Sequence, residues 1–244
     1  MGAFEEAANR MSGSKRPITT MFMLISVDGK ISTGCSSARD FDSDFAVIDG
    51  LSAGLKQYYD IEKTTDEWTL CTGLTKTKIG INDVKDYVEP VPAKIAIIDN
   101  HNLTRIGVEN LCKQYERVVV FTHNNYHPAM GITDGKLSTC YMDSVTVEDV
   151  LARLKSYYGV DELTLQTGGY TNGELIHGGL VDYIDFVIAP VIIGGVNTPS
   201  VVGGKSFQTF EELKQMAILE CLSVTVLKDN YVRMRYKVVN NRRN

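Results

Sequence analysis

Cysteine is scarce in this sequence and never occurs in close pairs. The 244 residues contain no CxxC motif and only five cysteines, which are Cys35, Cys71, Cys112, Cys140 and Cys221. An odd number of widely spaced cysteines argues against a disulfide framework and is typical of reduced thiols. The cysteine pattern therefore predicts a cytoplasmic protein.

Long apolar runs and excess positive charge are missing as well. No uncharged stretch approaches the roughly 20 residues of a membrane span, so no membrane association is expected. The start, residues 1–16, is polar and acidic where a signal peptide would be apolar, and we interpret it as a flexible tail. The net charge of −5 argues against a general affinity for nucleic acid, although a local basic pocket for an anionic small molecule remains compatible with it.

Several common motifs are absent. No GxGxxG follows the first predicted strand, which excludes the usual Rossmann fingerprint, and no zinc-deaminase signature occurs. His123 and His127 are four residues apart, but Pro128 and the polar surroundings predict a solvated loop there. No metal site is therefore expected.

What the sequence does contain is a series of short apolar runs alternating with helical patterns. Helices are predicted from Asp42 or Ser43 to about Tyr58, from Thr146 to Tyr158, and from Thr171 to Gly179. Strands are predicted over residues 18–25, 68–71, 94–99, 117–122, 162–166, 183–189, 217–226 and 231–239. This alternation predicts an α/β fold with a mostly parallel mixed sheet, because βαβ units place their strands in parallel. The last two strands surround Lys228-Asp229-Asn230 and predict a C-terminal antiparallel hairpin, in a single domain of residues 17–240.

Two segments carry candidate chemistry. In residues 166–177 (QTGGYTNGELIH) a predicted strand ends, two glycines follow and a helix begins, and such a turn offers free amides to an anion such as a pyrophosphate. The alternative is a tight strand-to-helix turn with no ligand. In residues 26–30 (SVDGK) a carboxylate and an ammonium follow a buried strand, which suits a polar pocket, but taken alone this pattern favours an ordinary Asp-Gly turn with a solvated lysine.

Taken in order, these segments resemble the reductase domain of riboflavin biosynthesis, which has a dihydrofolate-reductase-like three-layer fold. MLISVDGKIS (residues 23–32) is similar to the opening strand and loop of that family. LTLQTGGYTNGELIHGGLVDYIDFVIAPVIIGG (residues 163–195) is similar to its later signature, and the resemblance extends from about Arg16 to Val239. The chain departs from the family at Ile79, where an aspartate is usual, and at Asp60–Lys63, where an arginine is expected.

The resemblance implies a set of site residues. Catalytic roles fall to Asp28 and Lys30, and substrate contacts fall to Ser36 and Gln166. Cofactor contacts fall to Ser26, Thr75, Asn100, Gly168, Gly169, Tyr170, Thr171, Asn172 and Gly173. Position rather than resemblance supplies candidates for a 2′-phosphate contact, namely the basic residues at or just beyond predicted strand ends: Lys76, Lys78, His101, Arg105 and His123.

The implied activity is the NADPH-dependent reduction of a ribosylamino side chain on a phosphorylated pyrimidine, in a homodimer. Two alternatives stay open at this point. One is a reductase of the same fold that acts on a dihydrofolate or another pterin, and the other is a protein that binds a nucleotide without turnover.

Overall fold

The computed structural model describes residues 14–36 and 38–241. Most of the tail predicted for residues 1–16 lies outside this range. Arg16, however, belongs to the folded domain: its side chain is buried and its Nη1 lies 2.7 Å from Oδ2 of Asp182. A buried charge needs such a partner, so the tail ends before Arg16.

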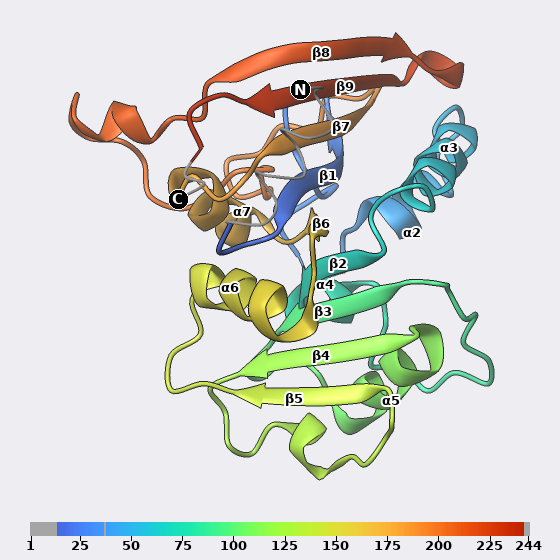
Figure 1. Cartoon of the computed structure of the whole chain (residues 1–244). Coiled ribbons are helices and arrows are strands. Elements are labelled where there is room, and N and C mark those ends of the chain that lie inside the picture. Colours follow the sequence, from blue (N-terminus) through green and yellow to red (C-terminus); the bar gives the residue numbers. More distant parts are fainter. Residues whose placement is uncertain (1–13, 37, 242–244) are drawn as a thin grey trace, which may run out of the picture.

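A single nine-stranded sheet forms the middle layer, in the order β5-β4-β3-β2-β6-β1-β7-β9-β8 (Figure 1). The strands are β1 (Ile18–Ser26), β2 (Trp68–Thr72), β3 (Lys94–Ile98), β4 (Arg117–Thr122), β5 (Leu137–Tyr141), β6 (Glu162–Gln166), β7 (Tyr183–Ala189), β8 (Leu219–Val226) and β9 (Val232–Val238). Strands β1 to β7 are parallel, whereas β9 pairs antiparallel with both β7 and β8. The predicted mixed sheet with its C-terminal hairpin is confirmed.

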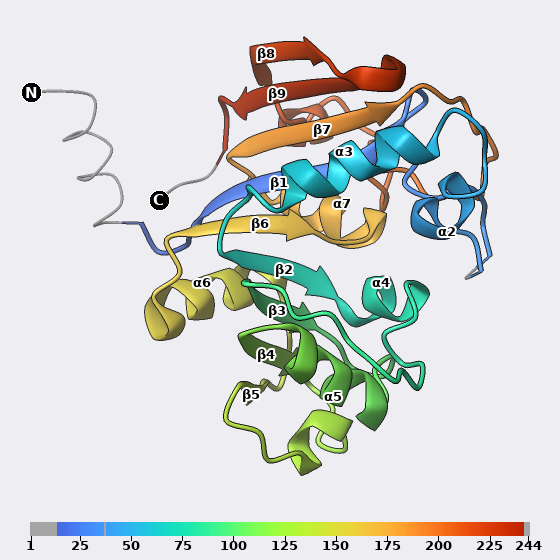
Figure 2. The same cartoon turned by 90° about the vertical axis from the view of Figure 1, so that its right-hand side faces the viewer.

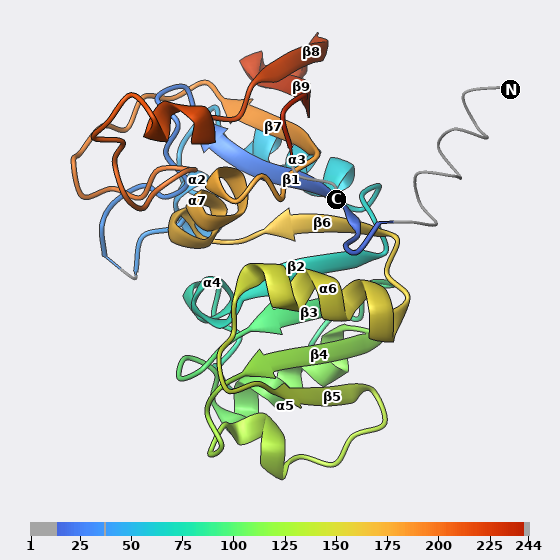
Figure 3. The same cartoon turned by 60° about the vertical axis from the view of Figure 1, so that its left-hand side comes forward.

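Helices cover both faces of the sheet. On one face lie α6 (Val147–Tyr158) and α7 (Gly169–His177), as Figure 3 shows; on the other lie α2 (Phe41–Phe45), α3 (Ser52–Glu62) and α5 (Arg105–Gln114), as Figure 2 shows. Short α4 (Gly73–Lys78) follows β2. Central strands such as β4 are apolar on both faces because both faces are covered.

Local signals set several boundaries correctly. Thr146 caps α6 by accepting a hydrogen bond from the Asp149 amide, and Gly159 ends the helix in the left-handed conformation at φ 67°. The helix predicted from Thr171 begins two residues earlier, at Gly169.

The helix predicted from Asp42 or Ser43 to about Tyr58 is wrong. Two helices stand there, because Gly50 adopts φ 83° between them and Asp40, rather than Asp42 or Ser43, caps the first. Helix α5 and strand β5 have no counterpart in the sequence prediction.

Candidate functional site

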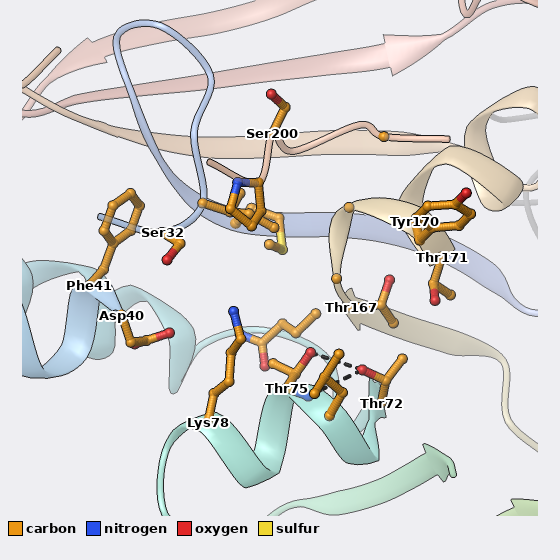
Figure 4. Close-up of a pocket in the computed structure, with 18 of the residues that line it drawn as sticks. Ser32, Asp40, Phe41, Thr72, Thr75, Lys78, Thr167, Tyr170, Thr171 and Ser200 are labelled. Atoms are coloured by element: carbon orange, nitrogen blue, oxygen red, sulfur yellow. Dashed lines mark hydrogen bonds between the residues drawn. The ribbon is translucent and has the colours of Figure 1, made fainter. Parts of the chain in front are cut away.

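A cleft of about 710 Å³ opens at the carboxyl ends of β1, β2 and β6. The start of α7, helix α4, the region of α2 and the segment 196–204 surround it (Figure 4). Ligands of α/β sheets bind at this edge, and the volume suits a small molecule. The same cleft receives Gln166 and Gly168–Thr171, which the sequence analysis assigned to substrate and cofactor.

The start of α7 presents amides that no protein group satisfies. Gly168 is the N-cap and supplies no side-chain cap. Within the described residues, no group accepts a hydrogen bond from the amides of Gly169, Tyr170 or Thr171. Uncapped amides at a helix N-terminus attract anions, so this end of the cleft suits a phosphate group.

The two glycines of this turn serve different purposes. Neither has a positive φ, so backbone conformation does not require glycine at either position. A Cβ on Gly169 would lie 2.2 Å from the carbonyl oxygen of Ser200, whereas a Cβ on Gly168 would meet nothing closer than Thr75 Oγ1 at 3.9 Å. Gly169 is therefore required by the close approach of another chain segment, and only Gly168 leaves space on the cleft side.

Asn172 and Gly173 support the same chain segment rather than line the cleft. Nδ2 of Asn172 donates to the carbonyl of Val201 at 2.8 Å, and a Cβ on Gly173 would lie 2.1 Å from the carbonyl oxygen of Gly203. Their predicted cofactor contacts stay untested, but their visible contacts hold the wall 200–204 against α7.

Helix α4 contributes Thr75 and Lys78 to the cleft. Oγ1 of Thr75 lies 2.9 Å from Oγ1 of the capping Thr72, and Lys78 extends its ammonium into the cleft (Figure 4). Lys76 also borders the cleft, but its buried ammonium donates to the Tyr115 hydroxyl at 2.9 Å. Of the five candidates for a 2′-phosphate contact, only Lys76 and Lys78 border the cleft; His101, Arg105 and His123 do not.

Acidic side chains occupy the part of the cleft near α2 and α3. Asp40, Asp42 and Glu62 all border it, and the sequence analysis assigned a site role to none of them. Burial raises the pKa of Asp40 to about 6, the nearby Asp42 adds to this effect, and the Lys78 ammonium opposes it. A signal for Asp40 existed, because an aspartate directly before an apolar helix start is a capping residue.

The loop Ser26–Lys30 lies behind the cleft wall rather than in it. The Asp28 carboxylate accepts hydrogen bonds from Ser26 Oγ at 2.6 Å and from the amides of Ile193 and Gly194 at 3.1 and 2.6 Å. These bonds lower the pKa of Asp28 to about 2. Buried Ser26 also accepts from the Lys30 amide at 2.8 Å, so the structure brings all three residues together without bringing them to the cleft.

The Lys30 ammonium is held by hydrogen bonds to residues 195–200, most of which border the cleft. It donates to the carbonyl oxygens of Gly195 and Thr198, both at 3.0 Å, and to Ser200 Oγ at 3.2 Å. The catalytic roles of Asp28 and Lys30 stay predictions, and the contacts that the structure gives them are those of residues that position segment 193–200.

Ser36 and Asn100 also lie away from the cleft lining. Ser36 is exposed. The side chain of Asn100 accepts from Thr122 Oγ1 at 3.2 Å and from the His123 amide at 2.9 Å, which joins the ends of β3 and β4. Neither residue lines the cleft, and their predicted contacts with substrate and cofactor stay predictions.

His127 is buried, so the prediction of a solvated loop is wrong at this residue. Its Nδ1 accepts from the Ala129 amide at 3.1 Å, which leaves Nε2 to donate to Asp99 at 2.9 Å. The sequence could not reveal this pair because Asp99 comes from another strand end. Within the described part of the chain, no cluster of His, Cys, Asp and Glu could hold a metal ion. In the same residues, no helix is long and apolar enough to cross a bilayer.

A model of the RibD C-terminal domain family matches residues 17–232. The chain belongs to this family. A 2,5-diamino-6-ribosylamino-4(3H)-pyrimidinone 5′-phosphate reductase from Aquifex aeolicus is 33% identical over 60 residues, which cover 25% of this chain and 27% of that protein.

Solved structures share the fold of this RibD C-terminal domain. A Thermotoga maritima diaminohydroxyphosphoribosylaminopyrimidine deaminase/5-amino-6-(5-phosphoribosylamino)uracil reductase superposes with a TM-score of 0.61 at 17% identity, covering 92% of this chain and 57% of that one. The Saccharomyces riboflavin biosynthesis reductase Rib7 superposes with a TM-score of 0.58 at 10% identity, covering 98% and 100%. The predicted dihydrofolate-reductase-like fold and the predicted riboflavin-reductase family are thus confirmed.

Proposed function

We propose that this chain is an NADPH-dependent reductase that converts the ribosylamino side chain of a phosphorylated aminopyrimidine to ribitylamino. The observation that carries the proposal is the cleft of a RibD C-terminal domain, with uncapped α7 amides and hydrogen-bonding side chains facing one space. The substrate class comes from the names of the Aquifex and Thermotoga relatives. Because the matches cover only 27% and 57% of those two proteins, their activities come to this chain as a proposal.

The residues of the cleft fit a dinucleotide cofactor. The amides of Gly169, Tyr170 and Thr171 would hold its pyrophosphate, and Gly168 leaves room for it beside Thr75. Bound NADPH supplies a hydride. The chain contributes binding and orientation: Gln166 and Glu62 offer hydrogen bonds to the pyrimidine, and Met23 and Phe41 provide apolar lining that limits water.

The test is NADPH oxidation, followed by its near-ultraviolet absorbance, with the ribosylaminopyrimidine phosphates as substrates. We expect turnover with NADPH and a lower rate with NADH. Turnover of dihydrofolate alone would favour the pterin alternative. NADPH binding in a direct titration without turnover of any of these substrates would favour a nucleotide-binding protein and contradict the proposed activity.

A homodimer is the second part of this proposal. Every residue of β8 is exposed, and the strand lies at the edge of the sheet, where one side of its backbone has no neighbouring strand among residues 14–36 and 38–241. Leu222, Val224 and Val226 are 48%, 57% and 76% exposed. An apolar edge strand of this kind invites pairing, and a second copy of the chain would cover it.

A further inference from the structure

Two polar side chains from distant parts of the sequence meet at the part of the cleft near α3. Glu62, the last residue of α3, accepts a hydrogen bond at 2.5 Å from Nε2 of Gln166, the last residue of β6. The same Nε2 lies 3.4 Å from the hydroxyl of Tyr58, whose ring stacks on Phe22 with centroids 4.9 Å apart. Both Glu62 and Gln166 border the cleft. Because Tyr58 is buried and stacked on Phe22, the hydroxyl that contacts Gln166 has a fixed position.

The pair offers hydrogen-bond acceptor atoms to the cleft. Within the described residues, neither the second carboxylate oxygen of Glu62 nor the amide oxygen of Gln166 accepts a bond from another group. Burial and the charge of Asp42 raise the pKa of Glu62, whereas the bond from Gln166 and the charges of Lys76 and Lys63 oppose the increase. A partly buried carboxylate in this situation is stabilised by a ligand that supplies N–H donors.

The names of two relatives each contain a pyrimidine substrate, and the two pyrimidines carry different groups at ring position 2. The pyrimidinone of the Aquifex reductase carries an amino group at ring position 2, and the uracil of the Thermotoga reductase carries a carbonyl oxygen there. The amino group and the adjacent ring N–H form a pair of donors that matches two carboxylate oxygens. The carbonyl oxygen would instead place an acceptor against an acceptor.

We propose that Glu62, oriented by Gln166, binds the position-2 edge of the pyrimidine and selects the 2-amino substrate over the uracil. The proposal rests on the proposed reductase function and specifies its substrate. Glu62 is then the residue that decides specificity, and the chain would act on the ring before position 2 is deaminated rather than after.

The experiment measures kcat/KM with NADPH for 2,5-diamino-6-ribosylamino-4(3H)-pyrimidinone 5′-phosphate and for 5-amino-6-(5-phosphoribosylamino)uracil. We expect the protein to prefer the diamino substrate by about 100-fold, since leaving a partly buried acceptor without its donor has a cost of up to that order. Glu62→Gln retains an acceptor for Gln166 but removes the carboxylate, and should reduce this ratio by about tenfold or more through loss of the diamino activity. Asp60→Asn is the matched control, since Asp60 lies on the same helix, is exposed and forms its one ion pair within the described part of the chain with Lys63.

The outcomes separate this proposal from the proposed function. Turnover of the uracil at an equal or higher kcat/KM overturns the role of Glu62 and leaves the reductase function standing. A ratio that Glu62→Gln leaves unchanged, with the variant folded by circular dichroism, also overturns it. Turnover of neither substrate overturns both proposals, whereas a ratio lowered by Glu62→Gln and kept by Asp60→Asn supports the inference.

Discussion

At the scale of single residues, Gly168 and Gly169 are adjacent and have opposite requirements. Gly168 has φ −76° and ψ 162°, a conformation that alanine adopts readily, and open space around its Cβ direction. Gly169 has the Ser200 carbonyl oxygen 2.2 Å from that position. A substitution at Gly168 therefore tests ligand binding, whereas a substitution at Gly169 tests the packing of the chain.

We predict that Gly169→Ala destabilises the protein by about 1–3 kcal/mol, as overpacking does, because the Ser200 segment must move. Gly168→Ala should leave the melting temperature nearly unchanged and weaken NADPH binding, because the methyl group occupies the space beside Thr75. Thermal unfolding and a fluorescence titration with NADPH measure the two effects. Unchanged NADPH affinity in a folded Gly168→Ala variant would contradict the assignment of this turn to the cofactor.

Asp28 and Asp40 are predicted to respond to pH in opposite directions. The pKa of Asp28 falls from 3.8 to about 2 on folding, so its contribution to stability is present above pH 4 and disappears as the pH falls towards 2. The pKa of Asp40 rises from 3.8 to about 6, so stability decreases as the pH increases from about 4 to 6.

The measurement is the melting temperature from pH 2 to pH 7 for the wild type, Asp28→Asn and Asp40→Asn. The advantage of wild type over Asp28→Asn should shrink only below pH 4. Relative to Asp40→Asn, which keeps a side chain able to cap α2, the wild type should lose stability between pH 4 and 6. Parallel pH curves for all three proteins would contradict both assignments.

At the scale of elements, hydrogen bonds from the loop after β1 fix the position of the segment that lines the cleft. Lys30 supplies three hydrogen bonds to Gly195, Thr198 and Ser200, and the backbone adds bonds from Ile31 to Pro199 and from Val201 to Gly29. The segment is then positioned for its contact with the start of α7.

Lys30→Met should release this segment and weaken both NADPH and substrate binding, by about tenfold each, since several hydrogen bonds of roughly 1 kcal/mol are lost together. Lys30→Arg retains a cation and should recover part of the loss. The readouts are NADPH affinity by fluorescence and the separate changes in KM and kcat. A large decrease in kcat with unchanged NADPH affinity and KM would indicate that Lys30 acts in the chemical step instead.

At the scale of the whole molecule, the sheet ends very differently at its two edges. Strand β5 pairs with β4 beside α5 and the short 3-10 helix Pro128–Gly131, whereas β8 and β9 extend past the helices at the other edge (Figure 1). The exposed β8 strand is thus the surface that an assembly would bury.

We predict a species of twice the 27.0 kDa chain mass by light scattering on a sizing column, and Val224→Lys should convert it to a monomer. A charge placed on an apolar edge strand opposes its pairing. Tyr126→Lys is the control, because Tyr126 is 93% exposed and lies near the 3-10 helix, away from β8. A monomeric wild type, or a dimer that tolerates Val224→Lys, would contradict the assignment of this surface.

The sequence alone determined what depends on neighbouring residues. Strands β4, β6 and β7 were predicted with their observed bounds because short apolar runs between turn residues are local signals, and the cap at Thr146 is equally local. The resemblance of residues 23–32 and 163–195 predicted the family, and the succession of a strand, two glycines and a helix pointed to the turn at Gly168, which borders the cleft.

Tertiary structure decided how these residues are used. Gly169 faces Ser200, Lys30 bonds to Gly195, and Gln166 meets Glu62 across 104 positions of sequence. Each of these contacts joins segments distant in the chain, so residue type and spacing could place a lysine near a strand end but could not show whether its ammonium faces the cleft or the wall behind it. That direction follows only from the way the segment 191–201 packs against the loop after β1, and the direction distinguishes a residue that can touch a ligand from one that supports the site.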